Sequence, residues 1–516
     1  MTDSVLTAVD VSFDPYTGAE RGGVDHTSPA EVEGMLALAV RAGSMLAATS
    51  PATRENWLSA VAGALLEHQE ELAVLADEET GLGLTRLRAE LAGTARSILF
   101  YASVAVEGSY LGASSDLVSE SISLARWNIP VGPVTVFGAS NFPFAFGVFG
   151  HDVASALSAA CPVIAKAHPA HPRLSLRVAG IARETLLSAG APAGTYDMVV
   201  GFDAGLQLVD SPAIKTIAFT GSQGGGMALR DRAAVRGVPV FAEMGTVNPA
   251  FVTTAAVADS AGTEAIAAGY VGSFTLGAGQ FCTKPGLIFA PAGSGMFDAV
   301  ARLVGEVPAA PLLTAGIAVR FASGTAELAA AAGGTAASAA FVGEGYASAA
   351  QVFRVAIADL IPGSRLLEEC FGPVALVCEY DDGAAALDAL AGLQGSLAAS
   401  VFTGGSTDPE TAGILAHLLP KVGRVALNAW PTGVANTWSQ QHGGPWPATS
   451  RSEATSVGAG ALSRFVRPVA LQNADPQTLP AFFASENPWQ IPRRIDGVLT
   501  LPVPSAVPLS ASKDLS

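Results

Sequence analysis

The chain has 516 residues, of which 50% are hydrophobic and only 14% charged, and its formal net charge is −17. The length predicts two or three domains, and the acidic balance, without a cluster of Lys and Arg, argues against nucleic acid or an anionic membrane as a partner. A long uncharged stretch, 127–150, contains three prolines, so we expect no membrane-spanning helix although the mean hydropathy is +0.40.

The first hundred residues carry helical signals. Ser28, Pro29 and Glu31 predict a capping box with proline at the first helical position, and apolar residues follow at helical spacing. A second helix is predicted to begin near Ser50. The later segment 118–127 alternates between apolar and polar residues, which predicts one half-exposed strand.

Short apolar runs then alternate with helical segments, which predicts βαβ units and parallel sheets. The first group lies at 134–137, 163–165, 196–200 and 214–219. The second group, which predicts a second α/β domain, lies at 248–253, 286–290, 374–380 and 425–428. The Ala- and Gly-rich segment 328–340 is predicted to be a packed helix and loop, and the tail after Pro502 to be loosely held.

A glycine-rich segment, 219–226, lies between a predicted strand and a helical stretch at 227–234. Exposed backbone N–H groups at such a junction suit a phosphate group, although an ordinary strand–helix turn explains the glycines equally well. The segment lacks the lysine of a nucleotide-hydrolysing loop, so nucleotide hydrolysis is disfavoured.

Four cysteines without paired spacing, and an amino terminus without the pattern of a secretory signal, predict a cytoplasmic protein with no disulfide framework. Cys282 differs from the others because small residues surround it and Lys284 could favour its thiolate form. The alternative is that it is a small buried hydrophobic residue. That alternative is our prediction for Cys161, Cys370 and Cys378.

Two further residues have surroundings that suit catalysis. Glu243 lies inside an apolar run, so burial is expected to raise its pKa toward the range of a general base; the alternative is a glutamate at a helix end or on the surface. Asn141 follows a predicted strand, where its amide could donate to an oxyanion or belong to an ordinary turn. His168 and His171 have no obvious third ligand, so we predict no metal site. The chain contains no Gly-x-Ser-x-Gly, which disfavours a nucleophile-elbow hydrolase.

These segments occur in an order that resembles the aldehyde dehydrogenase superfamily across nearly the whole chain. The motifs are Asn141-Phe-Pro, Lys166 after a strand, Phe219-Thr-Gly-Ser, Glu243-Met-Gly with Asn248-Pro, Gly279-Gln-x-Cys and Glu369-Cys-Phe-Gly-Pro-Val. More narrowly, the chain is similar to the branch of 2-oxoglutarate semialdehyde dehydrogenases and NADP-dependent fatty aldehyde dehydrogenases. The segments shared with that branch are 137–143, 166–172, 428–434, 442–447 and 487–496.

The resemblance implies a mechanism. Cys282 would attack the aldehyde as a thiolate, the Asn141 amide and the Cys282 backbone N–H would hold the oxyanion, and Glu243 would activate water to hydrolyse the thioester left after hydride transfer. These residues argue against a non-catalytic binding protein, and Glu243 argues against an acylating dehydrogenase. The cofactor would be held by Lys166 at the adenosine ribose, Gly221 and Ser222 at the pyrophosphate, and Glu369 and Phe371 at the nicotinamide end.

Cofactor and substrate preference also follow from the resemblance. Pro169 stands where NAD-preferring members often carry a glutamate that repels a 2′-phosphate, so we expect NADP, with NAD as the alternative. Gln223 and Met227, however, stand where related chains often have a basic residue. Lys284 replaces the more usual asparagine after Cys-Thr, where it would lower the Cys282 pKa, attract a substrate carboxylate or turn away.

The leading substrate is 2-oxoglutarate semialdehyde, and the alternative is a medium- or long-chain aliphatic aldehyde. An apolar tunnel would favour the alternative, whereas a basic residue that reaches the tunnel would favour the carboxylate-bearing substrate. The candidates for the tunnel wall are Phe142, Phe281, Trp430 and Trp446.

The fold implied is α/β and aldehyde dehydrogenase-like, with a Rossmann-like cofactor domain, a second parallel-sheet catalytic domain and a small β element that joins subunits. The expected boundaries are 1–116 and 132–242 for the cofactor domain, 243–445 for the catalytic domain, 117–131 and 464–502 for the oligomerisation element, and 503–516 for the tail. Because family members are dimers or tetramers, we expect a homodimer or homotetramer that acts on a small-molecule aldehyde.

Overall fold

The computed structural model describes residues 8–333, 336–338 and 343–502. The predicted helix starts are confirmed: Ser28 accepts a hydrogen bond from the Glu31 amide, and the Glu31 carboxylate accepts one from the Ser28 amide at 2.8 Å. Ser50 caps the second helix. None of the helices in these ranges is long and apolar enough to cross a membrane. The first four helices are α1 (Pro29–Ala47), α2 (Pro51–Glu67), α3 (Gln69–Thr80) and α4 (Leu84–Glu107).

The first large sheet has five parallel strands in the order β7-β6-β5-β8-β9. Its strands are β5 (Val134–Phe137), β6 (Val163–Lys166), β7 (Tyr196–Val199), β8 (Thr216–Gly221) and β9 (Val240–Met244). The helices that follow its strands are α5 (His151–Ser158), α6 (Pro172–Ser188), α7 (Phe202–Asp210) and α8 (Gln223–Ala234). Because the chain proceeds outward from β5 on one side and returns on the other, the carboxyl ends around β5 form the crevice where such sheets bind ligands.

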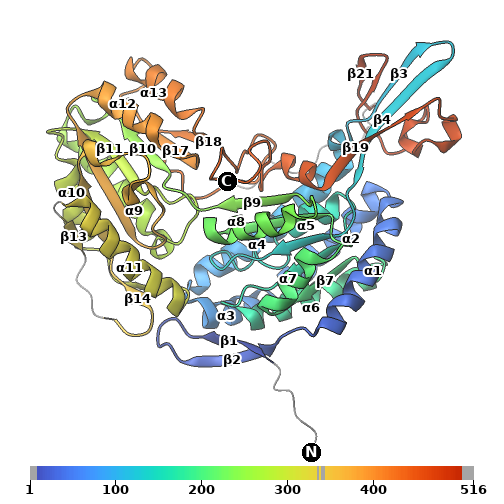
Figure 1. Ribbon diagram of the computed structural model, residues 1–516, viewed down its shortest axis with the longest axis horizontal. Helices are drawn as coiled ribbons and strands as arrows, with labels where there is room; N and C mark the ends of the chain where they lie inside the picture. Colours follow the sequence, from blue (N-terminus) through green and yellow to red (C-terminus); the bar gives the residue numbers. More distant parts are fainter. Residues whose placement is uncertain (1–7, 334–335, 339–342, 503–516) are drawn as a thin grey trace, which may run out of the picture.

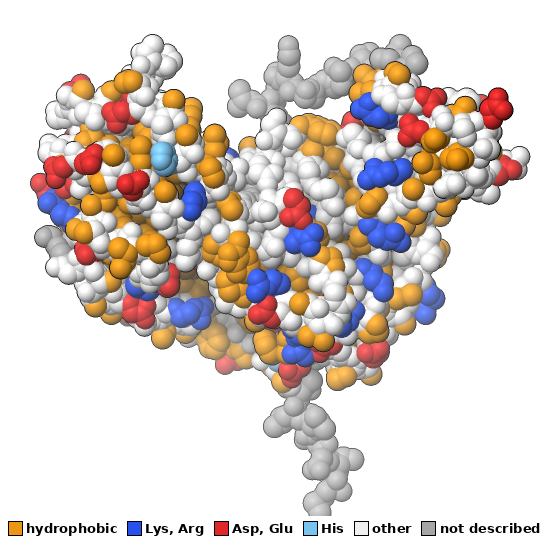
Figure 2. Space-filling model, turned by 45° about the horizontal axis from the view of Figure 1, so that its top comes forward, with side chains coloured by type: hydrophobic (Ala, Val, Ile, Leu, Met, Phe, Trp, Pro, Cys, Tyr) orange, Lys and Arg blue, Asp and Glu red, His pale blue; other side chains and the backbone are white. Residues whose placement is uncertain are grey.

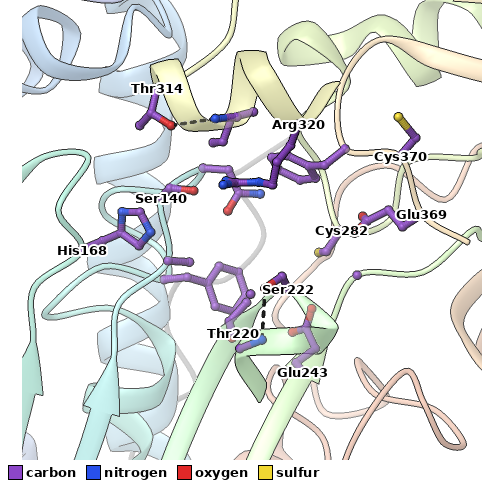
Figure 3. Close-up of a pocket in the computed structure, with 18 of the residues that line it drawn as sticks. Ser140, His168, Thr220, Ser222, Glu243, Cys282, Thr314, Arg320, Glu369 and Cys370 are labelled. Atoms are coloured by element: carbon purple, nitrogen blue, oxygen red, sulfur yellow. Dashed lines mark hydrogen bonds between the residues drawn. The ribbon is translucent and has the colours of Figure 1, made fainter. Parts of the chain in front are cut away.

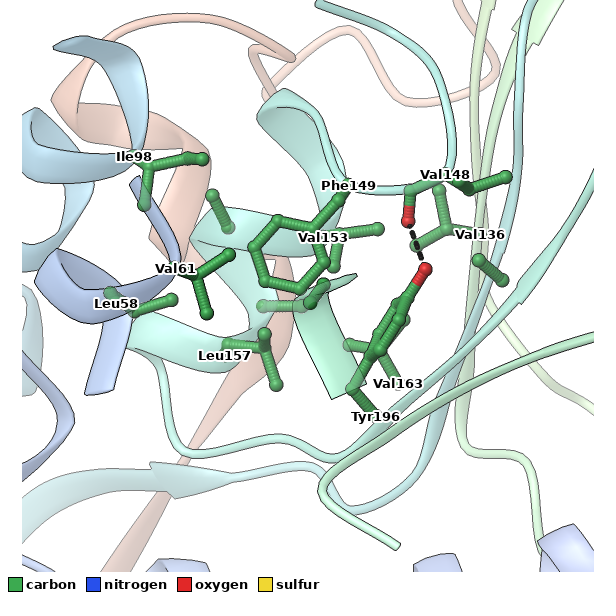
Figure 4. Packing of buried hydrophobic residues seen from close by; sticks show 14 of the residues in the cluster. Leu58, Val61, Ile98, Val136, Val148, Phe149, Val153, Leu157, Val163 and Tyr196 are labelled. Atoms are coloured by element: carbon green, nitrogen blue, oxygen red, sulfur yellow. Dashed lines mark hydrogen bonds between the residues drawn. The ribbon is translucent and has the colours of Figure 1, made fainter. Parts of the chain in front are cut away.

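The core of this domain lies between the sheet and the helices α2, α4 and α5 (Figure 4). Phe149 is 1% exposed and packs edge-on against Tyr196, with ring centroids 4.9 Å apart. The Tyr196 hydroxyl donates to the Val148 carbonyl at 2.8 Å, so the polar end of this buried ring is satisfied. The apolar strands predicted from the sequence are therefore interior strands.

The second large sheet has seven strands in the order β13-β15-β16-β11-β10-β17-β18, and only β13 is antiparallel to its neighbour. Its strands are β10 (Pro249–Val252), β11 (Leu287–Pro291), β13 (Ala336–Ser338), β15 (Gln351–Val355), β16 (Val374–Tyr380), β17 (Ser396–Phe402) and β18 (Val422–Leu427). Its helices are α9 (Ser260–Thr275), α10 (Met296–Val304), α11 (Ala315–Ala332), α12 (Gly383–Gly392) and α13 (Glu410–Leu418).

A third sheet, in the order β19-β4-β3-β20-β21, projects from the body at the upper right of Figure 1. The prediction of one strand over 118–127 is wrong, because the chain turns after Ser119 and forms a hairpin in that region. Figure 2 shows apolar side chains at the surface of this projection, and Leu117 is 67% exposed. Its strands are β3 (Ser114–Ser119), β4 (Ile122–Pro130), β19 (Val466–Gln472), β20 (Arg493–Ile495) and β21 (Val498–Thr500).

Other local expectations differ from the structure. The glycines after Ser222 form the first turn of α8 rather than a loop, because the Ser222 side chain caps that turn. Strands β9, β15 and β17 were not predicted, since β9 and β15 each carry a charge and β17 is rich in small residues. Part of the segment 328–340 and the tail 503–516 lie outside the described residues. Two short pairs complete the fold: β1 (Val9–Phe13) with β2 (Glu20–Asp25), and β12 (Ala310–Pro311) with β14 (Ala347–Ser348).

Candidate active site

A cavity of about 610 Å³ lies at the carboxyl ends of β5, β6, β8 and β9, and α11 and the segment 365–371 of the second domain line its other side. This is the size of a small-molecule site. Figure 3 shows side chains from both domains turned toward one another across it. The sequence-predicted residues that line it are Asn141, Phe142, Gly221, Ser222, Glu243, Cys282, Glu369 and Phe371.

Cys282 follows a tight left-handed turn at the end of α9. Gly277, Ala278 and Gly279 have φ angles of 57°, 55° and 67°, and a Cβ on Gly279 would overlap the backbone of Gly372. Such a conformation costs energy in a residue with a side chain, so the turn at Ala278 is strained. Burial raises the pKa of the Cys282 thiol well above its ordinary value, and the negative charge of Glu243 raises it further.

Lys284 does not activate Cys282. Its side chain is buried, and Nζ donates to the carbonyls of Cys370, Gly372 and Val374 at 2.7, 3.1 and 2.9 Å. The expectations that Lys284 favours the thiolate or attracts a substrate carboxylate are therefore wrong, because all three donors of its ammonium group are spent on backbone. Its role is to hold together two segments beside the cavity.

Glu243 extends from β9 into a pair with a histidine that motif reasoning gave no role. Its Oε2 accepts from Ser456 Oγ at 2.7 Å and lies 3.0 Å from His442 Nε2, and that same Nε2 lies 3.7 Å from Cys282 Sγ. The expectation of a raised Glu243 pKa is wrong in sign. Burial does raise this pKa, but the charge of His442 and the hydrogen bonds from His442 and Ser456 outweigh burial and lower it.

The ligating atoms of Glu243, Cys282 and His442 lie within 4.8 Å of one another, close enough for a metal ion. One nitrogen, His442 Nε2, faces both other groups, and because an ionised carboxylate only accepts, Nε2 carries a hydrogen and donates it to Glu243. The imidazole therefore positions the carboxylate beside the thiol. Of the other two histidines, His171 is buried with its Nε2 3.0 Å from the Ala139 carbonyl, whereas His168 lines the cavity and its Nδ1 accepts from the Ala170 amide at 3.1 Å.

Asn141 lines the cavity where the strand β5 gives way to a turn. Its Nδ2 donates to the Gln280 carbonyl at 2.8 Å, which ties it to the segment that carries Cys282. An amide carries two N–H donors, so one remains for an oxyanion. Its backbone carbonyl accepts from Arg86 Nη2 at 2.7 Å. The fold therefore fixes the position of this donor from both sides.

The other end of the cavity has groups that suit a dinucleotide. The amino-terminal turn of α8 lies at its wall, with Ser222 and Gly225 among the lining residues, so backbone N–H groups and the helix dipole are available to phosphate. Thr220 Oγ1 and Glu369 Oε1 are buried without a hydrogen-bond partner among the described residues. Burial raises the pKa of Glu369 to about 7. A Cβ on Gly245 would overlap the Glu369 carboxylate, so the glycine leaves room for it.

Basic residues lie near this end, among them Arg365, which lines the cavity and pairs with Glu327. Lys166 ends β6 and packs against Gly205 rather than lining the cavity, and burial lowers its pKa. Arg320, which sequence reasoning missed, reaches the cavity from α11 of the second domain and makes no ion pair with the described residues (Figure 3). Gln223 is engaged elsewhere, since its Nε2 donates to the Gly245 carbonyl at 3.0 Å. The sequence marks Arg320 only as a lone cation in an apolar helix.

The four predicted tunnel residues do not share one wall. Phe142 lines the cavity. The Phe281 ring packs edge-on against the Phe142 ring, and the two ring centroids lie 5.0 Å apart. Trp430 packs against Phe402, with centroids 4.4 Å apart. Trp446 is 47% exposed and lies under Arg230. The structure does not bring either tryptophan to this cavity.

Comparison with known proteins agrees with this geometry. Residues 6–311 match the aldehyde dehydrogenase family. The chain is 38% identical over 509 residues to alpha-ketoglutaric semialdehyde dehydrogenase 2 of Azospirillum brasilense, covering 94% of this chain and 95% of that one. It is 37% identical over 465 residues to alpha-ketoglutaric semialdehyde dehydrogenase of Acinetobacter baylyi, covering 88% of each.

Solved structures confirm the predicted fold. The NAD-dependent aldehyde dehydrogenase of Sinorhizobium meliloti has a TM-score of 0.78 at 24% identity, covering 93% of this chain and 94% of that one. Aldehyde dehydrogenase 21 of Physcomitrella patens has a TM-score of 0.77 at 21% identity, covering 92% and 97%. The chain belongs to the aldehyde dehydrogenase family, whose members oxidise aldehydes with a nicotinamide dinucleotide.

Proposed function

We propose that this protein oxidises 2-oxoglutarate semialdehyde to 2-oxoglutarate with NADP as the preferred cofactor. The observation that carries the chemistry is the convergence of Cys282, His442 and Glu243, with contacts of 3.7 and 3.0 Å, in one cavity with Asn141. The two relatives at 37–38% identity, both named for this semialdehyde, support the substrate. No observation favours a long aliphatic aldehyde, since the two tryptophans of the supposed tunnel lie elsewhere.

The nucleophile needs a base. Burial and the Glu243 charge keep Cys282 protonated at neutral pH. Glu243 is ionised because its pKa is lowered, and its carboxylate lies within 4.8 Å of the thiol, so it takes the proton. His442 Nε2 and Ser456 Oγ donate to Glu243 Oε2 and hold the carboxylate in place. The thiolate then bonds to the aldehyde carbon, and the carbonyl electrons move to its oxygen. The free N–H of the Asn141 amide and the Cys282 backbone N–H stabilise that oxyanion.

The residues that would hold the dinucleotide are those with unmet hydrogen-bond capacity. The first turn of α8 with Ser222 would bind the pyrophosphate, and Glu369 would accept from ribose hydroxyls. Phe371 would pack on the nicotinamide. Lys166 does not line the cavity, so it would bind the adenosine ribose only where the dinucleotide extends beyond the cavity along β6. The chemistry that a bound nicotinamide dinucleotide supplies is acceptance of the hydride from the hemithioacetal, which leaves a thioester on Cys282.

Hydrolysis of that thioester uses the second carboxylate oxygen. Glu243 Oε1 is buried and has no partner among the described residues, so it can accept a proton from water. The water oxygen bonds to the thioester carbon, the C–S bond breaks, and the acid leaves while the sulfur electrons return to Cys282. Glu243 thus serves both steps: it takes the thiol proton first and, after that proton has passed to solvent, it takes the proton of water.

Cofactor preference and assembly are further parts of the proposal. Pro169 is exposed and offers no carboxylate to repel a 2′-phosphate, and Arg320 adds a positive charge to the cavity. The apolar third sheet supports a homodimer or homotetramer built through it. The domain boundaries predicted above and a cytoplasmic location, in keeping with four free cysteines, belong to the same proposal.

The test is to follow reduced nicotinamide absorbance with 2-oxoglutarate semialdehyde and each cofactor. We expect turnover with both cofactors, with NADP preferred, and none in Cys282→Ala. The matched control is Cys161→Ala, which changes a buried cysteine of the first domain, outside the cavity. Full activity in Cys282→Ala would overturn the mechanism, and a preference for NAD of more than about tenfold would overturn the Pro169 argument.

A further inference from the structure

A half-buried arginine lies beside the reacting end of the cavity and has no part in the steps above. Arg86, in the first turn of α4, has a side chain that is 22% exposed. Its guanidinium carbon lies 5.1 and 4.9 Å from the ring centroids of Phe142 and Phe281. Phe142 lines the cavity, and Phe281 directly precedes Cys282. One aromatic side chain therefore separates this charge from the space in which the aldehyde reacts.

Most of the guanidinium's hydrogen-bonding capacity is unspent. Nη2 donates to the Asn141 carbonyl at 2.7 Å, whereas Nη1 is buried and has no partner among the described residues. Arginine carries five N–H donors, and a buried cation without full pairing is costly. An arginine with unpaired N–H groups in such a place is suited to a ligand that accepts their hydrogen bonds.

The carboxylate that faces Arg86 does not complete it. Glu90 Oε2 lies 4.0 Å from Arg86 Nε, beyond hydrogen-bond distance, and Glu90 Oε1 accepts from the amides of Phe144 and Ala145 at 2.9 and 3.1 Å. Burial raises the pKa of Glu90, which weakens its negative charge further. The pair is therefore a loose one that leaves Arg86 able to bind a second carboxylate.

The backbone on the other side of Arg86 is shaped around the guanidinium. A Cβ on Gly277 would overlap Arg86 Nη1 and crowd the Phe281 ring. The next residue, Ala278, keeps the same left-handed conformation despite its side chain. Strain of this kind concentrates at functional sites because the surrounding contacts must hold it. This turn ends three residues before Cys282, so the same backbone positions the charge and the nucleophile.

We propose that Arg86 binds the far carboxylate of an aldehyde substrate while the aldehyde carbon lies at Cys282. The inference rests on the proposed function and names the residue that selects an ω-oxo acid over an uncharged aldehyde. The charged hydrogen bonds fix the acid end, and Phe142 and Phe281 pack along the carbon chain between the two ends. Arg86 is thus a specificity-determining residue that stays unchanged through the reaction. Its bond to the Asn141 carbonyl remains in place throughout.

The test uses two pairs of substrates that differ in the carboxylate: 2-oxoglutarate semialdehyde with pentanal, and succinic semialdehyde with butanal. In Arg86→Met, the ratio of kcat/KM for each semialdehyde to that for its uncharged counterpart is expected to fall about 30- to 100-fold, mostly through KM, whereas the loss of the hydrogen bond to the Asn141 carbonyl affects all four aldehydes alike. Arg86→Lys retains the charge and is expected to recover part of the loss. The matched control is Arg88→Met on the same helix, whose guanidinium pairs with Glu70 at the surface.

A purely structural role for Arg86 predicts a different result. If the residue acts only by holding Asn141, then Arg86→Met lowers kcat for all four aldehydes equally, and that outcome overturns the inference. Product inhibition by 2-oxoglutarate gives a second readout, with an inhibition constant raised about tenfold or more in Arg86→Met and unchanged in Arg88→Met. A wild-type enzyme inactive on 2-oxoglutarate semialdehyde but active on succinic semialdehyde would overturn the proposed substrate alone. Activity on pentanal and butanal only would overturn both.

Discussion

The two ends of the cavity differ in how far their polar groups are satisfied. At the reacting end, Glu243 Oε2 is held by Ser456 and His442, and Asn141 is held by Gln280. At the cofactor end, Glu369 Oε1 and Thr220 Oγ1 have no partner among the described residues. The fold thus preorganises the reacting end and leaves the other end to be completed by a ligand. Exceptions at the reacting end include Glu243 Oε1, the atom assigned to water, and Arg86 Nη1, a donor assigned to the substrate carboxylate.

Glu243→Gln is expected to cause the largest loss of activity among the changes at the reacting end. It removes the acceptor for the hydrolytic water, so steady-state turnover is expected to fall about 10²- to 10⁴-fold. The first hydride transfer persists in part, and rapid mixing should show a burst of about one reduced nicotinamide per site followed by a slow phase. Ser456→Ala removes only one hydrogen bond to Oε2 and serves as the milder comparison. Slow turnover without a burst would mean that the variant is slowed in a step before the thioester forms, and not in its hydrolysis.

His442→Gln tests how His442 keeps Glu243 ionised. We expect hydride transfer at neutral pH to fall about 10- to 100-fold, because Glu243 loses the charge that lowers its pKa against burial and is then protonated. The sign follows from that shift: raising the pH ionises Glu243 again, so the defect shrinks. Pre-steady-state rates and alkylation by iodoacetamide across pH measure the defect. A defect independent of pH would contradict this role of His442.

Ordered motifs in the sequence identified candidate residues that the structure brings into one cavity, but not the electrostatics of these residues. Glu243 and Cys282 were candidates because of their immediate neighbours, yet the pKa of Glu243 is set by His442, about two hundred residues away in the chain. The direction of the Glu243 pKa shift depends on this tertiary contact, which cannot be predicted from the residues next to Glu243 in the sequence. Lys284 shows the same limit, since its position two residues after Cys282 suggested activation while its side chain points to backbone carbonyls.

The fold was more predictable than the site because its signals are local. Runs of apolar residues fixed most parallel strands, and Ser28 with Glu31 marked the first helix. The hairpin within 118–127 was missed because an exposed strand and an exposed turn share one polar–apolar pattern. Arg320 could not be foreseen, since it reaches the cofactor end from a helix of the other domain.

Glu369→Gln tests the cofactor end of the cavity through the pH dependence of the cofactor KM. The pKa of Glu369 is raised to about 7, so below that pH the protonated form accepts less well from ribose hydroxyls. The KM for the cofactor is therefore expected to rise up to about tenfold per pH unit below 7 in the wild-type enzyme. In Glu369→Gln it should be higher at alkaline pH and flat with pH. Glu368→Gln alters the exposed neighbouring carboxylate and is the control.

Arg320→Met should have the smallest effect, because the side chain is exposed and its charge is screened by water. We expect the cofactor KM to rise about three- to tenfold with kcat unchanged, and the wild-type KM to depend more steeply on salt than that of the variant. Arg302→Met, on α10 of the same domain and paired with Glu264, is the control. A larger loss for NADP than for NAD would assign Arg320 to the 2′-phosphate, and an equal loss would assign it to phosphates common to both. An unchanged KM would mean that the first turn of α8 neutralises the cofactor without help from the second domain, leaving an acidic protein to bind its anionic cofactor mainly through backbone.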